Sequence, residues 1–126
     1  MSFVEFKEVT KTYTMGSVKV HAVHDMNFSI EEGVLCVIVG PSGAGKTTVL
    51  NMLGGMDTCT SGSIYLDGKE IGGLSEKEST LYRRHDIGFV FQFYNLVPNL
   101  TAKENVELAS QICLDPMQPE DALRAV

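Results

Sequence analysis

One stretch of this chain decides its fold, and it reads Gly40-Pro41-Ser42-Gly43-Ala44-Gly45-Lys46-Thr47. This stretch has the pattern of a phosphate-binding loop, in which a glycine is followed by any four residues and then by Gly-Lys-Thr. The run 34–39 ahead of it is entirely apolar, which predicts a strand buried on both faces. The apolar face at Val49, Leu50 and Leu53 predicts a helix behind it. Since such a loop works between a buried strand and a helix N-terminus, the stretch lies in its working context.

The glycines of the loop have a chemical purpose. Gly40, Gly43 and Gly45 let successive backbone N–H groups turn inward as an anion-binding nest, which side chains would crowd. The other residues that line the predicted phosphate cradle are Pro41, Ser42 and Ala44.

Three residues at the start of the predicted helix carry polar groups suited to a nucleotide. We expect Lys46 to reach the β- and γ-phosphates and Thr47 to supply a hydroxyl ligand to Mg²⁺. Thr48 is a further candidate phosphate donor. The helix dipole also favours an anion at this end. The sequence therefore predicts a nucleoside triphosphate site, with Mg²⁺ bound together with the nucleotide.

Composition limits the partners. The chain has 126 residues, of which 44% are hydrophobic, enough for one core. Its 10 Lys and Arg against 16 Asp and Glu leave a net charge of -6, which argues against a nucleic-acid partner. No apolar run approaches the length of a membrane span, and the N-terminus has no signal-peptide pattern. We expect a cytoplasmic protein that meets the membrane only through a partner.

The regions around the loop predict an antiparallel lobe. Alternating residues in 1–33 favour two or three antiparallel strands, with a turn at Met15-Gly16-Ser17. A hairpin is predicted within 61–73, where Asp67-Gly68 forms the turn. We assign both regions to an antiparallel β lobe.

The remaining chain predicts parts of a parallel core and of a helical region. Capping boxes at 75–78 and 101–104 start helices that run to about Arg84 and to 113. The run 87–91 predicts a second buried strand, and another helix begins near Pro119. The fold class is therefore α/β, with an antiparallel lobe joined to a parallel core.

The order of the motifs resembles the ATP-binding subunits of ABC transporters. Residues 9–13 resemble the stretch before that family's aromatic A-loop residue, the phosphate-binding loop follows, and residues 88–92 resemble the strand that leads into its Q-loop. Residues 51–57 and 83–107 are similar to the branch that serves lipoprotein release, macrolide export, antimicrobial-peptide export and cell division. The resemblance implies a P-loop NTPase core of ABC type.

The resemblance also implies roles for two further residues. Tyr13 would stack on the adenine of ATP, although a strand tyrosine packed on the lobe has the same pattern. Gln92 would contact Mg²⁺ or the attacking water and share catalysis with Lys46, although a strand can also simply end on a polar residue. Residues 93–100 would dock on the membrane-spanning transporter subunit, although an aromatic and apolar stretch can also simply pack under the helical subdomain.

Several family motifs do not occur in the sequence. It contains no signature segment of the Leu-Ser-Gly-Gly-Gln type, and after Gln92 no apolar strand ends in paired acidic residues. We expect the N-terminal portion of a longer ATPase subunit, truncated before the helical subdomain and the later core strands. Its parts would be the core at 34–55 and 87–92 and the start of the helical subdomain at 101–126.

This partial set of motifs has consequences for activity and assembly. Phosphoryl transfer needs an anchored metal, a positioned water and charge stabilisation, so we expect the chain to bind nucleotide but hydrolyse it little or not at all. The longer protein would dimerise with a second ATP-binding subunit. The incomplete core would leave apolar faces and strand edges exposed, which favours self-association.

Two other classes of function are compatible with a phosphate-binding loop. A non-catalytic nucleotide-binding or regulatory module would match the missing acidic residues. A small-molecule kinase or a GTPase would carry the same loop, but those folds usually place it near the start of the chain, without an antiparallel lobe ahead of it. GTPase base-recognition motifs do not occur here.

Overall fold

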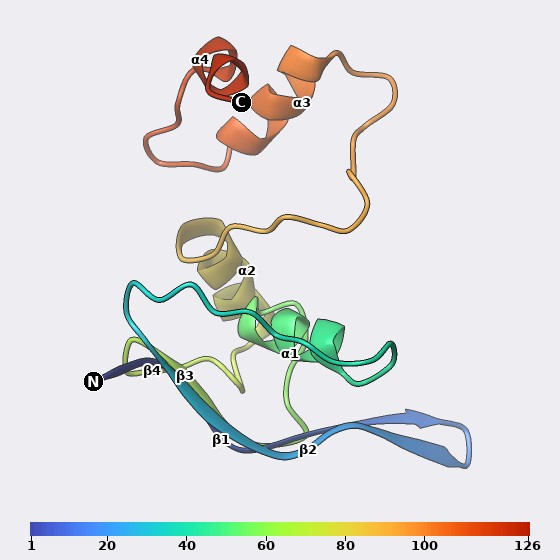
Figure 1. Cartoon of the computed structure of the whole chain (residues 1–126). Helices are drawn as coiled ribbons and strands as arrows, with labels where there is room; N and C mark the ends of the chain where they lie inside the picture. Colours follow the sequence, from blue (N-terminus) through green and yellow to red (C-terminus); the bar gives the residue numbers. More distant parts are fainter. The chain divides into compact units, whose positions relative to one another are not determined.

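The computed structural model describes all 126 residues, which form two compact units, residues 1–83 and residues 84–126. Figure 1 shows the antiparallel strands in the first unit and the last two helices in the second. The first unit contains the phosphate-binding loop. No helix in the chain is both long enough and apolar enough to cross a membrane.

A four-stranded sheet is the frame of the first unit. Its strands are β1 (Ser2–Met15), β2 (Val18–Glu31), β3 (Ser61–Leu66) and β4 (Lys69–Glu70). They lie in the order β2-β1-β3-β4, and every neighbouring pair is antiparallel. The two long strands β1 and β2 form the blue hairpin in Figure 1. The predicted antiparallel strands are thus confirmed.

Tight turns explain the hairpins. Gly16, between β1 and β2, has a φ of 62°, which a glycine adopts without strain. Asp67 and Gly68, between β3 and β4, have φ of 48° and 77°, so both central residues are left-handed as in a type I′ turn. Both turns occur where the sequence predicts them.

The apolar core lies wholly in the first unit. It joins one face of the sheet to α1 (Lys46–Leu53) and to α2 (Glu76–His85), which begins in this unit. The ring of Phe6 stacks on Phe28 across the β1–β2 pair, with 4.4 Å between ring centroids. The buried hydrophobic residues are Val4, Phe6, Val9, Val23, Val49, Met52, Ile64, Ile71 and Tyr82.

Two predicted strands are not formed, and this corrects the sequence analysis. Residues 34–39 and 87–91 have no β-ladder partner and no strand structure. Leu35 is 91% exposed and Val90 is 99% exposed, so neither run is buried on both faces. A parallel strand needs a neighbour on a sheet, and the sheet of this chain contains only antiparallel pairs made by other segments.

The second unit holds two short helices, α3 (Ala102–Ser110) and α4 (Pro119–Arg124). Thr101 caps α3 in the predicted capping box with Glu104, and Pro119 begins α4 as predicted. The helix α3 stops at Ser110 instead of 113, because the chain turns there and the Cys113 N–H donates to the Ser110 carbonyl.

Candidate functional site

The phosphate-binding loop is an exposed turn at the start of α1. Gly43 and Gly45 have φ of 79° and 93°, in the left-handed region that glycine tolerates. The Ala44 N–H donates to the Pro41 carbonyl at 3.2 Å, which closes the turn. A β-carbon at Gly45 would lie 2.4 Å from the carbonyl oxygen of Ala22 on β2. Glycine is therefore required where the loop packs against the sheet.

The first turn of α1 has the properties of an anion site. Gly45 is the N-cap, and its carbonyl accepts the first helical hydrogen bond, from the Val49 N–H at 3.0 Å. The amide groups of residues 46–48 precede that bond and have no helical acceptor. No acidic residue lies in this turn to repel an anion. The amides and the helix dipole together favour a negatively charged ligand.

The cationic group of the loop is Lys46. Its Nζ donates to the carbonyl oxygens of Gly40 and Pro41, at 2.6 Å and 2.7 Å. Both acceptors belong to the loop itself, so the side chain folds back over the loop and its charge stays at the loop. Thr47 is exposed and Thr48 is half-buried.

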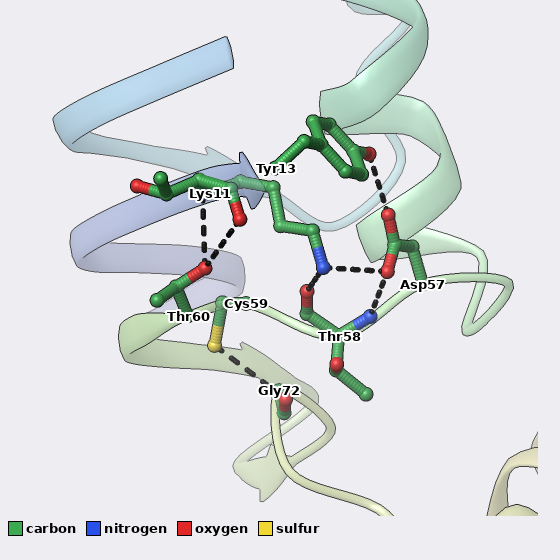
Figure 2. Close-up of polar contacts among 8 residues, drawn as sticks. Lys11, Tyr13, Asp57, Thr58, Cys59, Thr60 and Gly72 are labelled. Atoms are coloured by element: carbon green, nitrogen blue, oxygen red, sulfur yellow. Dashed lines mark hydrogen bonds and ion pairs between the residues drawn. The ribbon is translucent and has the colours of Figure 1, made fainter. Parts of the chain in front are cut away.

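Tyr13 lies in a polar cluster that joins β1 to the loop after α1 (Figure 2). Its hydroxyl donates to Oδ2 of Asp57 at 2.6 Å. Lys11 Nζ donates to Oδ1 of Asp57 at 2.7 Å and lies 5.1 Å from the centroid of the Tyr13 ring. The Tyr13 side chain is 38% exposed. We call Lys11, Tyr13 and Asp57 the tyrosine cluster.

The titration of these groups reflects their hydrogen bonds. Donation to the Asp57 carboxylate is the main cause of a raised Tyr13 pKa, and the Thr48 side chain acts in the opposite direction. Partial burial is the largest influence on Asp57 and raises its pKa, but hydrogen bonds from Lys11, Tyr13 and the Thr58 N–H together outweigh burial. The net result is an Asp57 pKa below its ordinary value, so the carboxylate is ionised at neutral pH.

The structure brings some of the predicted site residues together. The loop 40–48 and Tyr13 lie in the same unit. Gln92 belongs to the second unit, where it lies in an exposed bend, and its role remains a prediction from its motif. No group of three or more His, Cys, Asp or Glu residues could hold a metal ion.

Sequence reasoning missed two members of the tyrosine cluster. Lys11 and Asp57 are 46 positions apart, and no periodic pattern connects them. Asp57 occurs in the run 51–57, which resembles one branch of the family. That resemblance does not predict a contact between Asp57 and Tyr13.

A comparison with known protein families gives one match across most of the chain. The profile of the family described as "ABC transporter" matches residues 23–126. The ABC transporter ATP-binding protein MJ0796 of Methanocaldococcus jannaschii, described as uncharacterized, is 49% identical over 105 residues, covering 83% of this chain and 45% of that protein. The lipoprotein-releasing system ATP-binding protein LolD of Coxiella burnetii is 43% identical over 103 residues, covering 82% and 44%.

A solved structure of MJ0796 has the same architecture. It is a dimeric post-hydrolysis state of that ATP-binding cassette, bound to ADP and Pi, and it superposes with a TM-score of 0.86 at 44% identity. The match covers 96% of this chain and 54% of the MJ0796 chain. This chain thus spans about half the length of the relatives it matches.

Proposed function

The chain belongs to the ABC transporter family, and on that premise we propose that it binds ATP for a subunit that powers transport through a membrane partner. It is an N-terminal part of the ABC ATP-binding domain, with the antiparallel β lobe of that fold. The observation that carries the proposal is the left-handed Gly45 at the start of α1, which is packed against Ala22 and followed by amides without helical acceptors.

We assign the triphosphate to the loop 40–48. The loop amides and the start of α1 would surround the phosphates, and Lys46 would exchange its carbonyl acceptors for phosphate oxygens. The MJ0796 cassette, which shares this architecture, has been solved with ADP and Pi. The ligand of that structure supports a nucleotide with a phosphate chain as the ligand here.

The residues of the phosphate-binding loop fit a magnesium ion that is coordinated mainly by the nucleotide. Because no acidic or histidine cluster is present, the phosphate oxygens and water would supply most ligands, and the Thr47 hydroxyl would supply one. The bound ion would neutralise charge on the phosphates. In the longer protein, Gln92 would join it or orient the attacking water, and Lys46 would stabilise the transferred phosphoryl group.

The base end of the site would be formed by Tyr13. Its ring is 38% exposed and lies in the same unit as the loop. A partly exposed aromatic ring held in place is a stacking surface for adenine. The proposed site therefore has separate groups for the base and for the phosphates.

The assembly follows the family. MJ0796 forms a dimer in its solved structure, and we propose that the longer protein pairs with a second ATP-binding subunit and with a membrane-spanning transporter subunit. It would then lie at the cytoplasmic side of the membrane. In this arrangement, the antiparallel lobe contains residues 1–33 and 61–73. The parallel core of the longer protein contains residues 34–55 and 87–92, and the helical subdomain begins with residues 101–126. The residues of this chain supply nucleotide binding, and we propose that hydrolysis by residues 1–126 is slight.

Calorimetric titration of MgATP into the chain tests the proposal. We expect saturable binding to the unsubstituted chain and a loss of at least about tenfold in affinity for Lys46→Ala, because a charge-assisted contact to phosphate is removed. Lys77→Ala, at an exposed position of α2, is the matched control and should bind as tightly as the unsubstituted chain. Binding that is unaffected by Lys46→Ala would contradict the assignment of the loop.

Competition between nucleotides separates the ABC assignment from a GTPase. Stacking on Tyr13 offers no pattern of hydrogen bonds that selects guanine, so GTP should not bind much more tightly than ATP. A strong preference for GTP would favour the GTPase class. Steady ATP turnover by the chain that disappears in Lys46→Ala would show that hydrolysis needs no further residues.

A further inference from the structure

We propose that Asp57 is a positioning residue for the base: it holds the Tyr13 ring in the orientation that stacks on adenine, with Lys11 against one face of that ring. The inference rests on the proposed function, because it takes Tyr13 to be the base-binding residue. It adds two residues, Lys11 and Asp57, to a site that motifs alone limited to Tyr13 and the loop.

The Tyr13 ring is held at two points. Its hydroxyl donates to Asp57 Oδ2 at 2.6 Å, and the Lys11 ammonium lies over the ring at 5.1 Å from the centroid. A tyrosine has two main side-chain torsions, so a fixed hydroxyl and a covered face leave it little rotational freedom. The ring would otherwise lose that freedom when a base stacks on it, at a cost in affinity.

Asp57 is itself held in place by hydrogen bonds. Its Oδ1 accepts from Lys11 Nζ at 2.7 Å and from the Thr58 N–H at 2.8 Å, while Oδ2 accepts from Tyr13. Its own N–H donates to the Asn51 carbonyl of α1 at 3.2 Å. Lys11 also donates to the Thr58 carbonyl at 2.6 Å. These contacts make Asp57 a rigid support instead of a mobile surface carboxylate, as the sticks in Figure 2 illustrate.

Asp57 also lies close to the end of α1 along the chain. The phosphate-binding loop leads into the first residue of α1, Lys46, and Asp57 follows shortly after its last residue, Leu53. A helix of 8 residues is about 12 Å long and does not bend easily. One short helix therefore links the support of the base-binding ring to the phosphate-binding loop, which fixes the two halves of the site relative to each other.

Lys11 determines which face of the ring is free. Its ammonium lies over the ring, and its other contacts, to Asp57 and to the Thr58 carbonyl, keep it there. A base must then use the opposite face. The cation and the base would lie on the two sides of one aromatic ring, an arrangement in which each contact is made with the same ring orientation.

The test compares two ligands, ATP and inorganic tripolyphosphate, by calorimetry with the complete chain. Tripolyphosphate uses the loop but has no base. We expect Asp57→Asn to weaken ATP binding about two- to tenfold, the range for one side chain that is no longer held in place. Tripolyphosphate binding should not weaken. Asp67→Asn, the same change at the exposed β3–β4 turn, is the control and should leave both ligands unaffected.

Variants of the ring give an independent measurement. Tyr13→Phe keeps the stacking surface and removes the hydroxyl that Asp57 holds, so it should weaken ATP binding as much as Asp57→Asn does. The double variant should be no weaker than either single variant, because both remove one hydrogen bond. Tyr13→Ala should cost more than Tyr13→Phe, since the ring itself is lost.

Each outcome decides between the proposals. Full ATP affinity in both Asp57→Asn and Tyr13→Phe would overturn the positioning role while leaving the proposed function intact. An equal loss for ATP and tripolyphosphate would show that Asp57 only supports the fold, and would overturn the role as well. If the unsubstituted chain bound neither ligand, the proposed function would fail and this inference with it.

Discussion

Strand β2 and the run 34–39 are neighbours along the chain, but only β2 becomes part of a sheet. Residues 18–31 pair with β1 through a tight turn, whereas residues 34–39 pair with nothing. An antiparallel neighbour can come from the adjoining residues, while a parallel neighbour has to come from a distant part of a chain. Apolar content alone therefore does not make a strand, because a strand also requires a pairing partner.

All six residues of the unpaired run are exposed, including the two that face β2 across a pocket. Cys36 and Ile38 line an apolar pocket of about 430 Å³ together with residues 26–30 of β2 and Val49 of α1. On the outside, Leu35 and Val39 are 91% and 83% exposed. The phosphate-binding loop therefore connects an unpaired segment to a helix that packs in the core.

The sharpest difference between the two regions is expected in amide hydrogen exchange. Amides of β1 and β3, such as Phe6 and Ile64, should exchange only through global unfolding, because they lie in the centre of the sheet. Amides of residues 34–39 should exchange faster by about a thousandfold or more, for a domain of ordinary stability. Mass spectrometry of peptides from both regions measures this ratio. Strong protection at 34–39 would mean that this run is paired in solution, for example with another copy of the chain.

One substitution in the core and one in the unpaired run measure the same contrast as a difference in stability. Ile64 is fully buried, so Ile64→Ala should lower the free energy of unfolding by about 2–5 kcal/mol. Val37 is 74% exposed, so Val37→Ala should change it by less than about 0.5 kcal/mol. Urea denaturation followed by circular dichroism gives both values. A large effect at Val37 would place this residue in a core that the single chain does not have.

Two glycines, one in β3 and one in the turn between β1 and β2, allow a test with a smaller expected effect on stability. Gly62 has a φ of 86°, and a β-carbon there would lie 2.3 Å from the Glu8 carbonyl oxygen. Gly16 has a φ of 62° and open space around it. Alanine is strained by the left-handed φ at both positions, so this strain cancels in the comparison. The close contact at position 62 does not cancel, so Gly62→Ala should be less stable than Gly16→Ala by about 1–3 kcal/mol, the cost of overpacking. Equal thermal unfolding midpoints of the two variants would mean that β1 and β3 leave room for a β-carbon at position 62.

The smallest expected effect is the pH dependence from Asp57. Its pKa is lowered in the folded chain, so its contribution to stability is present above the unfolded pKa and disappears as the pH falls through the folded pKa. For a carboxylate this loss takes place below about pH 4. Asp57→Asn should therefore reduce the fall in stability with acid by about 1 kcal/mol, because Asp57 takes part in a single, half-buried ion pair. Urea midpoints between neutral and acid pH measure it, with Asp67→Asn as the control. An identical pH profile in Asp57→Asn would contradict the lowered pKa.

Features that depend on adjacent residues could be predicted from the sequence. The turns at Gly16 and at Asp67-Gly68, the capping box of Thr101 and Glu104, and the helix after the phosphate-binding loop all occur as expected. Each depends on backbone preferences or on hydrogen bonds over a few residues. The ABC family and fold class could also be recognised, because several motifs occur in a fixed order.

Features that depend on distant residues could not be predicted. The runs 34–39 and 87–91 have the composition of buried strands, but composition does not show whether a partner strand is available. The contacts of Asp57 with Lys11 and Tyr13 cross more than 40 positions, and only the folded sheet and α1 bring them together. The polar cluster around Tyr13 is therefore a result of the structure alone.

Nuclear magnetic resonance titration of the chain with MgATP shows whether the loop 40–48 and Tyr13 form one nucleotide site. We predict that the largest amide shifts occur at residues 40–48 and that the Tyr13 ring resonances shift as a base stacks on the ring. Tripolyphosphate should reproduce the shifts of the loop without those of the ring. Shifts at the loop with an unaffected Tyr13 ring would contradict the base site, and an unaffected loop would contradict the account as a whole.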